Sequence, residues 1–354
     1  MIDTLKIPVN RTSVSRLSQV DFDNLPFGRN FSDHMFVADY ENGEWKNLQI
    51  IPYGEITMSP AASALHYGQA IFEGIKAYRQ ANGEICIFRP DKNFERFNIS
   101  ADRMVMPQVP EDLFMQGMSQ LINLDHDWVP SKDGQSLYIR PFMFATDPVI
   151  GVHASDSYKF IIITGPTGAY YSKPLKVKIE MHYARAVEGG VGFAKTAGNY
   201  ARSLYPTQQA QKEGFDQLIW TDAKEHAYVE ESGTTNVMFV INDVLITPAS
   251  RDTILDGVTR NSILTLARAW GMPVEERRVT VAEVITAAKD GTLQEAFGAG
   301  TAATIAHIAQ IGFEGEVYTL PDPAKREFSN KALKALSDIR YGLSPDELGW
   351  NYAV

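Results

Sequence analysis

Residues 188–205, EGGVGFAKTAGNYARSLY, hold a single lysine, Lys195, among glycines and alanines. Such small residues let other atoms approach the backbone closely. The second part of the stretch begins a helical pattern that places Tyr200, Leu204 and Ala210 on one face. A lysine held in this way can form an imine with the carbonyl group of a cofactor. By itself the stretch more often indicates a solvated lysine in a glycine-rich loop. The choice between this interpretation and a cofactor-binding lysine therefore depends on the remaining motifs.

Length and charge limit what the chain can be. At 354 residues it is too long for one ordinary core, which predicts two domains. A net charge of -10 and a pI of about 5.3 argue against binding to nucleic acid or to an anionic membrane surface. No apolar run is long enough to span a bilayer. The one cysteine, Cys86, allows neither an intrachain disulfide nor a zinc site built from cysteines.

The N-terminal region, residues 1–20, contains Lys6, Arg11 and Arg16 with several serines, as transit peptides do. Asp3 and the acidic segment DFDN that follows argue against that interpretation. We interpret the region as an N-terminal arm and expect a cytoplasmic protein.

Both halves of the chain predict mixed α/β structure. In the first half a turn at residues 41–44 indicates a hairpin, and Asp91 is expected to cap a helix that runs to 104. A second helix is predicted at 112–124, and strands at 85–89, 137–144 and 158–164. Residues 165–176, GPTGAYYSKPLK, are rich in glycine and proline and are the best candidate for an interdomain loop. This predicts a small N-terminal domain, 1–164, and a large C-terminal domain, 177–354.

In the second half the predicted strands are 177–183, 217–221, 227–231, 237–241 and 244–247, with a tight turn at Asn242 and Asp243. Helices are predicted at about 260–270, 280–289, 302–309 and 326–340. The many hairpins favour two mixed α/β domains over a doubly wound parallel sheet.

Two glycine-containing turns are expected to open helices in the second half. They are LDGVTR at 255–260 and GAGTAA at 298–303. Free N–H groups at a helix start, together with a threonine hydroxyl, form an anion site suited to phosphate. Neither turn has the spacing of a nucleotide-binding motif. Most such turns are ordinary helix caps, but two of them beside a glycine-nested lysine favour phosphate binding.

Glu231 stands at the end of an apolar strand, before Ser232 and Gly233. A carboxylate there can keep a proton on a ring nitrogen, because an opposite charge favours the charged form of its partner. Regular alternation places Glu230 on the opposite face of the strand, so only one of the two can serve. Taken alone, Glu231 more often represents an exposed glutamate at a strand end.

Tyr138 and Arg140 are separated by one residue on a predicted strand, so they share a face. A hydroxyl beside a guanidinium suits a carboxylate ligand, although a solvated Tyr–Arg pair has about equal weight. The histidines show no metal-binding spacing. His66, and His307 on an expected helix, are interpreted as packing residues, and a hydrolase motif of the G-x-S-x-G type is absent.

Together these motifs resemble the branched-chain amino acid aminotransferases, which are pyridoxal-phosphate enzymes of fold type IV. The resemblance runs from about residue 31 to 342 and is specific, because the lysine, glutamate and GTA motifs occur in the family's order and separation. The matching segments are LHYGQAIFEGIKAYR (65–79), FRPDKNFERFNISADRM (88–104), SLYIRPFMFATDPVIGV (136–152), GPTGAYYS (165–172), GGVGFAKTAGNYARSL (189–204), YVEESGTTNVMFV (228–240), LDGVTRNSIL (255–264) and FGAGTAATI (297–305).

The resemblance implies a role for each matching residue. Lys195 is similar to the lysine that joins pyridoxal 5'-phosphate and moves the α-proton, Glu231 to the partner of the pyridine nitrogen, and Tyr200 to the partner of the phenolic oxygen. The residues that resemble the phosphate-binding set are Arg96, Val258, Thr259 and Thr301. Those that resemble the groups taking substrate carboxylates are Tyr67, Tyr138, Arg140, Thr301 and Ala302. Those that resemble pocket walls are Phe72, Lys76 and Tyr170.

The resemblance further implies a homodimer, because Val152 matches a residue that the family inserts into the neighbouring subunit's site. Two positions depart from the family. Asp256 replaces the usual proline before Gly-Val-Thr-Arg, and Ala303 and Ala306 stand where mammalian members carry paired redox cysteines. We expect phosphate binding to survive the first change, and we expect no thiol switch at the second.

The expected activity is transfer of the amino group of L-leucine, L-isoleucine or L-valine to 2-oxoglutarate by a ping-pong mechanism. The nearest alternatives are other fold type IV activities, namely a D-amino acid or amine transaminase or aminodeoxychorismate lyase. They share the lysine and glutamate, whereas the YIRP and HYG…FEG segments favour the branched-chain interpretation. A non-catalytic carrier of the cofactor and a plain binding protein are further alternatives; the Tyr138–Arg140 face argues against a carrier.

Overall fold

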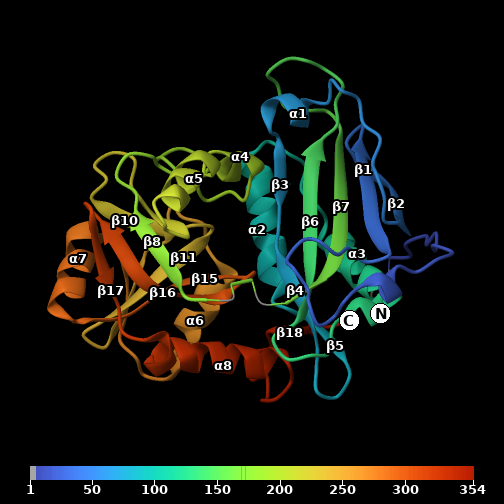
Figure 1. Cartoon of the computed structure of the whole chain (residues 1–354). Coiled ribbons are helices and arrows are strands. Elements are labelled where there is room, and N and C mark those ends of the chain that lie inside the picture. The colour runs from blue at the N-terminus through green and yellow to red at the C-terminus, as the bar shows by residue number, and fades with distance from the viewer. Residues whose placement is uncertain (1–4, 169, 172) are drawn as a thin grey trace. The chain divides into compact units, whose positions relative to one another are not determined.

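The computed structural model describes residues 5–168, 170–171 and 173–354, which form two compact units (Figure 1). Unit 1 contains the described residues up to Tyr170 together with Ala194–Ala197 and Asp338–Val354. Unit 2 contains Tyr171–Phe193 and Gly198–Ser337. Each unit has its own sheet and its own helices, which confirms the prediction of mixed α/β structure. No helix in the described ranges is long and apolar enough to cross a membrane.

Unit 1 is built on an antiparallel sheet with the strand order β18-β5-β4-β6-β7-β1-β2, and β3 pairs with β6. Its strands are β1 (His34–Glu41), β2 (Glu44–Pro52), β3 (Ala70–Phe72), β4 (Ile75–Arg79), β5 (Ile85–Phe88), β6 (Ser136–Ala145), β7 (Tyr158–Thr167) and β18 (Asn351–Ala353). Its helices include α1 (Ser63–Tyr67), α2 (Pro90–Arg103) and α3 (Glu111–Leu124), with short 3-10 turns at Leu17–Gln19 and His126–Trp128.

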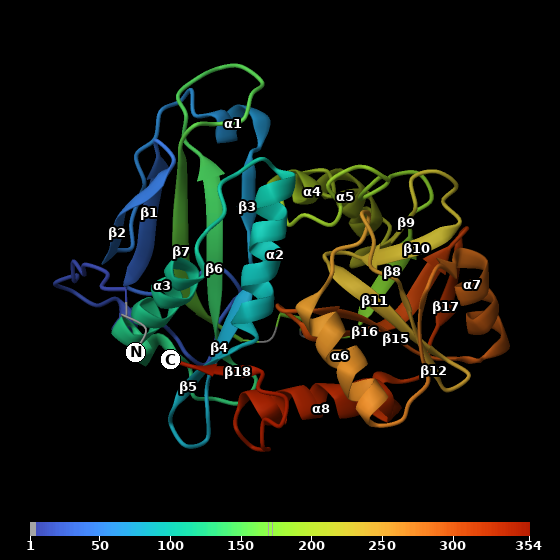
Figure 2. The same ribbon diagram turned by 180° about the vertical axis from the view of Figure 1, so that it is seen from behind.

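Alternation along β6 divides the residues of unit 1 between two faces. Leu137 and Ile139 are fully buried in the core, where Phe97 of α2 and Phe114 of α3 also lie. Figure 2 shows these two helices against one face of the sheet. Burying each such side chain contributes about 1.5–3 kcal/mol. Tyr138 and its neighbour Arg140 occupy the other face, so this core leaves that face for binding.

The start of α2 differs from the prediction. The helix begins at Pro90 rather than after Asp91, and the residue before it, Arg89, is the N-cap with a φ of 50°. Proline suits the first helical position because it has no N–H to satisfy and its φ is already helical. Asp91 is therefore a first-turn acid, where it interacts favourably with the helix dipole, and not the cap.

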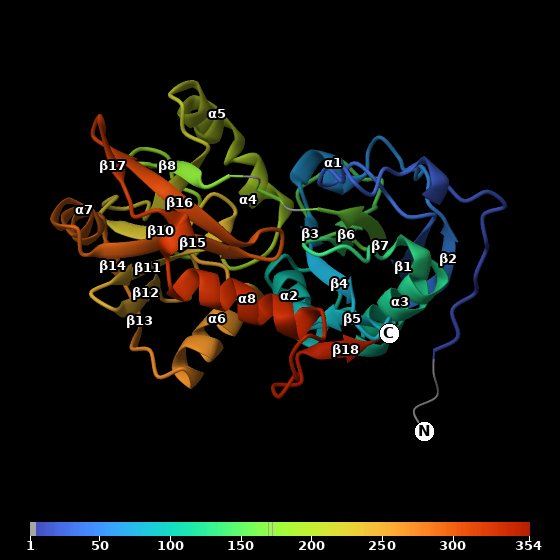
Figure 3. The same cartoon turned by 60° about the horizontal axis from the view of Figure 1, so that its bottom comes forward.

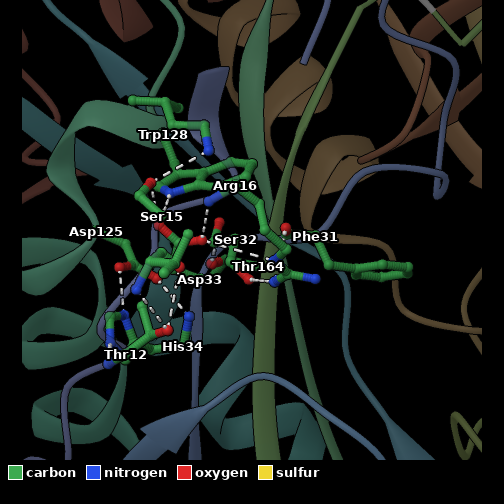
Figure 4. A network of polar contacts seen from close by, with 12 residues as sticks. Thr12, Ser15, Arg16, Phe31, Ser32, Asp33, His34, Asp125, Trp128 and Thr164 are labelled. Atoms are coloured by element: carbon green, nitrogen blue, oxygen red, sulfur yellow. Dashed lines mark hydrogen bonds and ion pairs between the residues drawn. The ribbon is translucent and has the colours of Figure 1, made fainter. Parts of the chain in front are cut away.

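A polar network joins the N-terminal arm to the sheet of unit 1 (Figure 4). Asp33 accepts hydrogen bonds from Ser15 Oγ at 2.6 Å, from the Arg16 N–H at 2.8 Å and from Trp128 Nε1 at 3.1 Å. Burial alone would raise the pKa of Asp33, but these donors and the Arg16 charge outweigh burial and lower it. The carboxylate of Asp33 thus holds an otherwise extended segment in place.

The neighbouring residue, His34, adds a second buried link. Its Nδ1 lies 2.7 Å from Asp125 Oδ1, and its Nε2 lies 3.0 Å from the backbone nitrogen of Thr12. Because the Thr12 N–H donates to Nε2, the proton of a neutral His34 belongs on Nδ1, where it is donated to Asp125. Burial raises the pKa of Asp125 despite this hydrogen bond.

Unit 2 contains a sheet with the strand order β13-β12-β11-β15-β16-β8-β9-β10-β14 (Figure 3). Pairing of β10 with β11 closes part of it into a small barrel, and β17 pairs with β16. The strands are β8 (Leu175–Ile179), β9 (Gln217–Thr221), β10 (Tyr228–Ser232), β11 (Thr235–Ile241), β12 (Val244–Pro248), β13 (Val274–Arg277), β14 (Val279–Thr280), β15 (Leu293–Gly300), β16 (Thr304–Phe313) and β17 (Glu316–Thr319). The helices are α4 (Ala197–Ala201), α5 (Leu204–Lys212), α6 (Val258–Ala269), α7 (Val281–Asp290) and α8 (Phe328–Arg340), and a 3-10 turn lies at Pro323–Lys325. The first residue of α4 and the last three residues of α8 belong to unit 1.

The predicted helix at 302–309 is wrong. Residues 301–303 form a turn, and β16 follows as a long strand that pairs with β15, placing His307 opposite Phe297. The segment TIAHIAQI places apolar residues at spacings that suit either a helix or a buried strand, so its periodicity does not separate the two. Pairing on both sides, with β15 and β8, decides for the strand.

Two further predictions in the second half need correction. The strand predicted at 177–183 ends at Ile179. The helical pattern after Lys195 is broken into α4 and α5, and Leu204 is 69% exposed whereas Ala210 is buried. The predicted common face of Tyr200, Leu204 and Ala210 therefore does not exist.

We predict that Asp33→Asn destabilises the protein by about 2 kcal/mol, because an amide cannot accept from all the donors around it and leaves buried groups unpaired. The matched control is Asp39→Asn, which removes a half-buried ion pair with Lys159 and should cost less than about 1 kcal/mol. Urea unfolding at pH 7 measures both. Because the pKa of Asp33 is lowered from 3.8, its contribution is present above that pH and is lost on acidification through the folded-state pKa. Equal effects of the two substitutions would contradict the assignment.

Candidate active site

Lys195 is held by its backbone within unit 1. Its carbonyl accepts a hydrogen bond from the Phe72 N–H at 3.0 Å, and its own N–H donates to Ser100 Oγ at 2.9 Å. The next residue, Thr196, donates from Oγ1 to the Ala70 carbonyl at 2.8 Å. Strand β3 and helix α2 therefore fix the lysine from two directions. Its Nζ lies 5.1 Å from the centre of the Phe72 ring.

A buried ion pair next to this strand was missed by the sequence analysis. Glu73 is fully buried, and Arg96 contacts it twice, from Nε at 2.7 Å and from the NH2 nitrogen at 2.8 Å. Asn93 Nδ2 donates at 2.7 Å and the Gly74 N–H at 3.1 Å. Burial would raise the pKa of Glu73, but the Arg96 charge and hydrogen bonds lower it. The signal in the sequence was an acid inside the apolar segment AIFEGI.

Tyr138 and Arg140 do lie together in unit 1, as their spacing predicts. An Arg140 NH2 nitrogen donates to Tyr138 Oη at 2.8 Å, and the guanidinium lies 4.6 Å from the Phe72 ring centre. Phe27 packs edge-on against Tyr138 at 4.8 Å, and against Tyr170 at the same distance. The guanidinium of Arg140 and the Nζ of Lys195 both lie near the Phe72 ring. Four of the predicted residues therefore lie together, namely Phe72, Tyr138, Arg140 and Lys195.

Lys76 stands opposite Tyr138 where β4 pairs with β6. Its side chain is buried, and burial lowers its pKa to about 7, with the nearby charge of Arg340 acting in the same direction. The amine of Lys76 therefore loses its proton far more readily than that of an exposed lysine. Tyr67, at the end of α1, is 41% exposed, and Val152, on the loop between β6 and β7, is 90% exposed.

Glu231 lies in unit 2, where an arginine that was not predicted accompanies it. Its Oε1 accepts the Leu255 N–H at 2.8 Å, and Arg185 Nε lies 3.1 Å from its Oε2. The Arg185 NH2 group donates to the carbonyls of Gly192 and Thr253. One buried guanidinium therefore orders the glycine-rich stretch, the segment before α6 and the carboxylate together.

Close packing explains the small residue at position 192. A Cβ on Gly192 would lie 2.7 Å from the Thr253 Cα and 2.8 Å from the Asp252 carbonyl oxygen. The neighbouring Phe193 N–H donates to that carbonyl at 3.0 Å. The close backbone approach expected for this stretch is thus made to the segment before α6.

Strand β10 is irregular at its two glutamates. Its pairing with β9 shifts register between Val229 and Ser232, so strict alternation of faces does not hold across Glu230 and Glu231. Both side chains are buried. Burial raises the pKa of Glu230 to about 7, while Arg185, which also contacts Glu231, acts to lower it. The argument from alternation that separated the two residues therefore does not apply.

Of the two turns proposed for phosphate, one opens a helix. Helix α6 starts at Val258 with Gly257 as N-cap, and no side chain of the described residues caps it. A Cβ on Gly257 would lie 2.0 Å from Asn236 Oδ1, so any larger residue there would require the Asn236 side chain to move. Val258 and Thr259 are buried at the start of the helix.

The other turn, which contains Thr301 and Ala302, links β15 to β16 and opens no helix, so the helix-start argument fails there. Tyr200 is placed on the short helix α4. Among the residues with described positions, no group of three or more His, Cys, Asp or Glu could hold a metal ion.

The similarity to known proteins extends over almost the whole chain. The family model described as amino-transferase class IV matches residues 70–311. The chain is 45% identical to branched-chain-amino-acid aminotransferase 2 of Bacillus subtilis over 98% of its length and 97% of the relative. A branched-chain aminotransferase of Thermoproteus uzoniensis, solved with norvaline, superposes with a TM-score of 0.74 at 25% identity, over 90% of this chain and 99% of the other. The branched-chain amino acid aminotransferase of Thermobaculum terrenum, solved in its PLP-form, gives 0.73 at 24% identity, over 92% and 98%.

We predict that Gly74→Ala disturbs the Tyr138–Arg140 pair, because the added Cβ would lie 2.3 Å from Tyr138 Oη. The Michaelis constant for 2-oxoglutarate should rise about tenfold, which corresponds to the loss of about 1.4 kcal/mol of carboxylate binding. Gly54→Ala is the matched control, since nothing lies within 4 Å of its Cβ position. Identical Michaelis constants for both variants and the wild type would remove the pair from carboxylate binding.

Proposed function

We propose how this chain, which belongs to the class IV aminotransferase family and is a branched-chain-amino-acid transaminase (EC 2.6.1.42), carries out its reaction. The reaction moves the amino group of L-leucine, L-isoleucine or L-valine to 2-oxoglutarate, and the cofactor is pyridoxal 5'-phosphate. The observation that carries the proposal is the clamping of Lys195 by β3 and α2 beside the Tyr138–Arg140 pair.

Residues in each unit, taken by itself, suit one part of this cofactor. In unit 2, the first turn of α6, which has no side-chain cap among the described residues, would hold the phosphate. Glu231 of the same unit, a buried carboxylate that Arg185 fixes in place, would face the ring nitrogen. In unit 1, the amine of Lys195 would bind the carbonyl carbon. When bound, the cofactor acts as an electron sink for the substrate's Cα.

Lys195 is proposed to do two tasks with one nitrogen. Its Nζ would bind the cofactor's carbonyl carbon, C4′. Once the substrate's amino group had replaced it there, the freed amine would take the proton from Cα as a base and deliver it to C4′ as an acid. The backbone clamp supports this role, because a proton is transferred efficiently only over a fixed short distance. Two half-reactions that use the same lysine give ping-pong kinetics.

Glu231 is proposed to keep a proton on the ring nitrogen, which favours negative charge developing at Cα. Tyr200 is proposed to donate to the phenolic oxygen. The phosphate is proposed to bind Arg96, Val258, Thr259 and Thr301. The buried Glu73 supports the role of Arg96, because it holds the guanidinium in one orientation through two contacts.

The substrate side chain changes between half-reactions from aliphatic to acidic. Phe72, Lys76 and Tyr170 are proposed as walls, which suits the aliphatic side chain. The carboxylates are proposed to bind Tyr67, Tyr138, Arg140, Thr301 and Ala302. The 2.8 Å contact between Arg140 and Tyr138 supports this, since it presents a guanidinium and a hydroxyl side by side.

We further propose a cytoplasmic homodimer. The buried thiol of Cys86, whose pKa is raised to about 12 by burial, is compatible with a reducing compartment. The loop after β6 exposes Val149, Ile150 and Val152 by 45%, 70% and 90%. Neighbouring exposed apolar residues are suited to burial against a second copy of the chain.

We predict that Lys195→Ala lowers transamination by a factor of about 10⁴ or more while the protein stays folded, because no other group replaces its amine. An absorbance spectrum taken before and after L-leucine, without a keto acid, follows the first half-reaction directly. The wild type should lose its yellow band, and so should the control Lys224→Ala, which changes an exposed lysine. Wild-type turnover in Lys195→Ala would end the proposal. A yellow band that does not change on addition of L-leucine would instead favour a D-amino acid transaminase, an amine transaminase or a lyase.

For the dimer, we predict that Val152→Asp raises the dissociation constant at least tenfold, because a charge would be buried at the contact. Sedimentation velocity at several concentrations measures this, against a chain mass of 39.4 kDa. Val14→Asp is the control, since Val14 is also well exposed but lies on the N-terminal arm. A wild type that sediments as a monomer at all concentrations would contradict the proposed dimer.

A further inference from the structure

Unit 2 holds a buried carboxyl group, that of Glu230, which the proposed mechanism does not use. The side chain is 4% exposed, and its Oε2 has no hydrogen-bond partner among the described residues. It is the direct neighbour of Glu231, which is equally buried. A buried carboxylate oxygen without a donor is costly, and the group avoids this cost by binding a proton.

Among the groups found around Glu230, Arg185 supplies the positive charge. Its Nε lies 3.1 Å from Glu231 Oε2, and its NH2 group donates to the carbonyls of Gly192 and Thr253. Glu231 has a further donor, the Leu255 N–H at 2.8 Å. Between the two glutamates, Glu231 is thus the one whose negative charge is compensated.

The other acid near Glu230 is Asp222, and it stays ionised. Its carboxylate accepts hydrogen bonds from the backbone N–H groups of Lys224, Glu225, Ala227 and Tyr228 at 3.3, 2.9, 2.9 and 2.8 Å. Burial would raise the pKa of Asp222, but these donors lower it. Any proton shared within this group of acids therefore goes to Glu230.

The surroundings of Glu230 come from four parts of unit 2. Arg185 follows β8, Asp222 follows β9, Glu231 belongs to β10 itself, and the hydroxyl of Thr253 precedes α6. Burial, Glu231 and Asp222 raise the pKa of Glu230, Thr253 and Arg185 lower it, and the balance is about 7. A change of one pH unit on either side of neutrality therefore changes the charge of this residue.

We propose that Glu230 is a positioning residue that sets the charge of the Arg185–Glu231 pair by binding or releasing one proton. With the proton bound, Glu231 and Arg185 balance each other. With the proton released, one guanidinium serves two carboxylates, the group carries an extra negative charge, and a proton on any nitrogen facing Glu231 is held more tightly. The inference rests on the proposed function, in which that nitrogen belongs to the cofactor ring.

The test compares the holoenzyme of the wild type with Glu230→Gln. Infrared difference spectra between pH 6 and pH 8 should show the carbonyl band of a protonated carboxylic acid disappearing in the wild type, with a midpoint near 7, and no such change in Glu230→Gln. With cofactor labelled with ¹⁵N in the ring, the nitrogen signal of the wild type should show a step at the same midpoint, and the variant should lose the step. Glu225→Gln, at an exposed glutamate, should behave as the wild type does.

Three results would overturn the inference. An infrared change that persists in Glu230→Gln would mean that another group titrates, and a nitrogen step that persists in this variant would mean that Glu230 is not coupled to the ring. Glu230→Asp keeps a carboxyl group and should retain both signals with a displaced midpoint; their loss would contradict the inference even if Glu230→Gln failed to fold.

Glu231→Gln separates this inference from the proposed function. A ring-nitrogen signal identical to that of the wild type would remove Glu231 from the mechanism. The infrared change of Glu230 reports its proton without reference to the cofactor, so it would still be expected in that variant, with its midpoint lowered because a neighbouring negative charge is gone.

Discussion

The pairing of the lysine segment with strand β3 is the constraint on which the candidate site depends. Lys195 and Thr196 are far from β3 in the sequence, yet they bond to Phe72 and Ala70 as a short extra strand would. Because β3 itself pairs with β6, the same sheet that carries Tyr138 and Arg140 also positions the lysine backbone. A side chain as flexible as lysine needs such support if its amine is to act at a fixed point.

In each unit, a charged residue that is proposed to bind the cofactor has a buried partner that holds it. Glu73 orients Arg96 in unit 1, and Arg185 orients Glu231 in unit 2, each through contacts of 2.7–3.1 Å between buried groups. Replacing one partner of such a pair costs more than the pair contributes, because the remaining charge is left buried and alone. These pairs therefore preserve geometry rather than add stability, as expected where precise placement of charge matters.

Sequence patterns predicted the parts of this molecule that depend on local order. The hairpin of β1 and β2, the strands β5, β6 and β7 and the tight turn at Asn242 and Asp243 follow from periodicity and turn chemistry, and Asn242 and Asp243 do adopt positive φ. The strands β3 and β4 were not predicted. The family resemblance supplied the activity and the cofactor, which no pattern alone could give. The helix predicted at 302–309 failed because its apolar spacing suits both structures, and only the partners β15 and β8 decide.

Glu73 and Arg185 could not be predicted from the sequence for a different reason. Each is a charged residue whose role becomes clear only from the partner that the fold places beside it. For Glu73 this partner is Arg96, 23 residues away in the sequence, and for Arg185 it is Glu231, which is further away. The properties of Lys76 and Glu230 also depend on the fold and not on the local sequence. Burial lowers the pKa of Lys76 from 10.5 to about 7 and raises that of Glu230 from 4.5 to about 7. A fold gains no stability from an ionisable group kept near its midpoint inside the protein. At Glu230, whose Oε2 has no hydrogen-bond partner among the described residues, burial is not fully compensated, and such groups are more typical of functional sites than of packed cores.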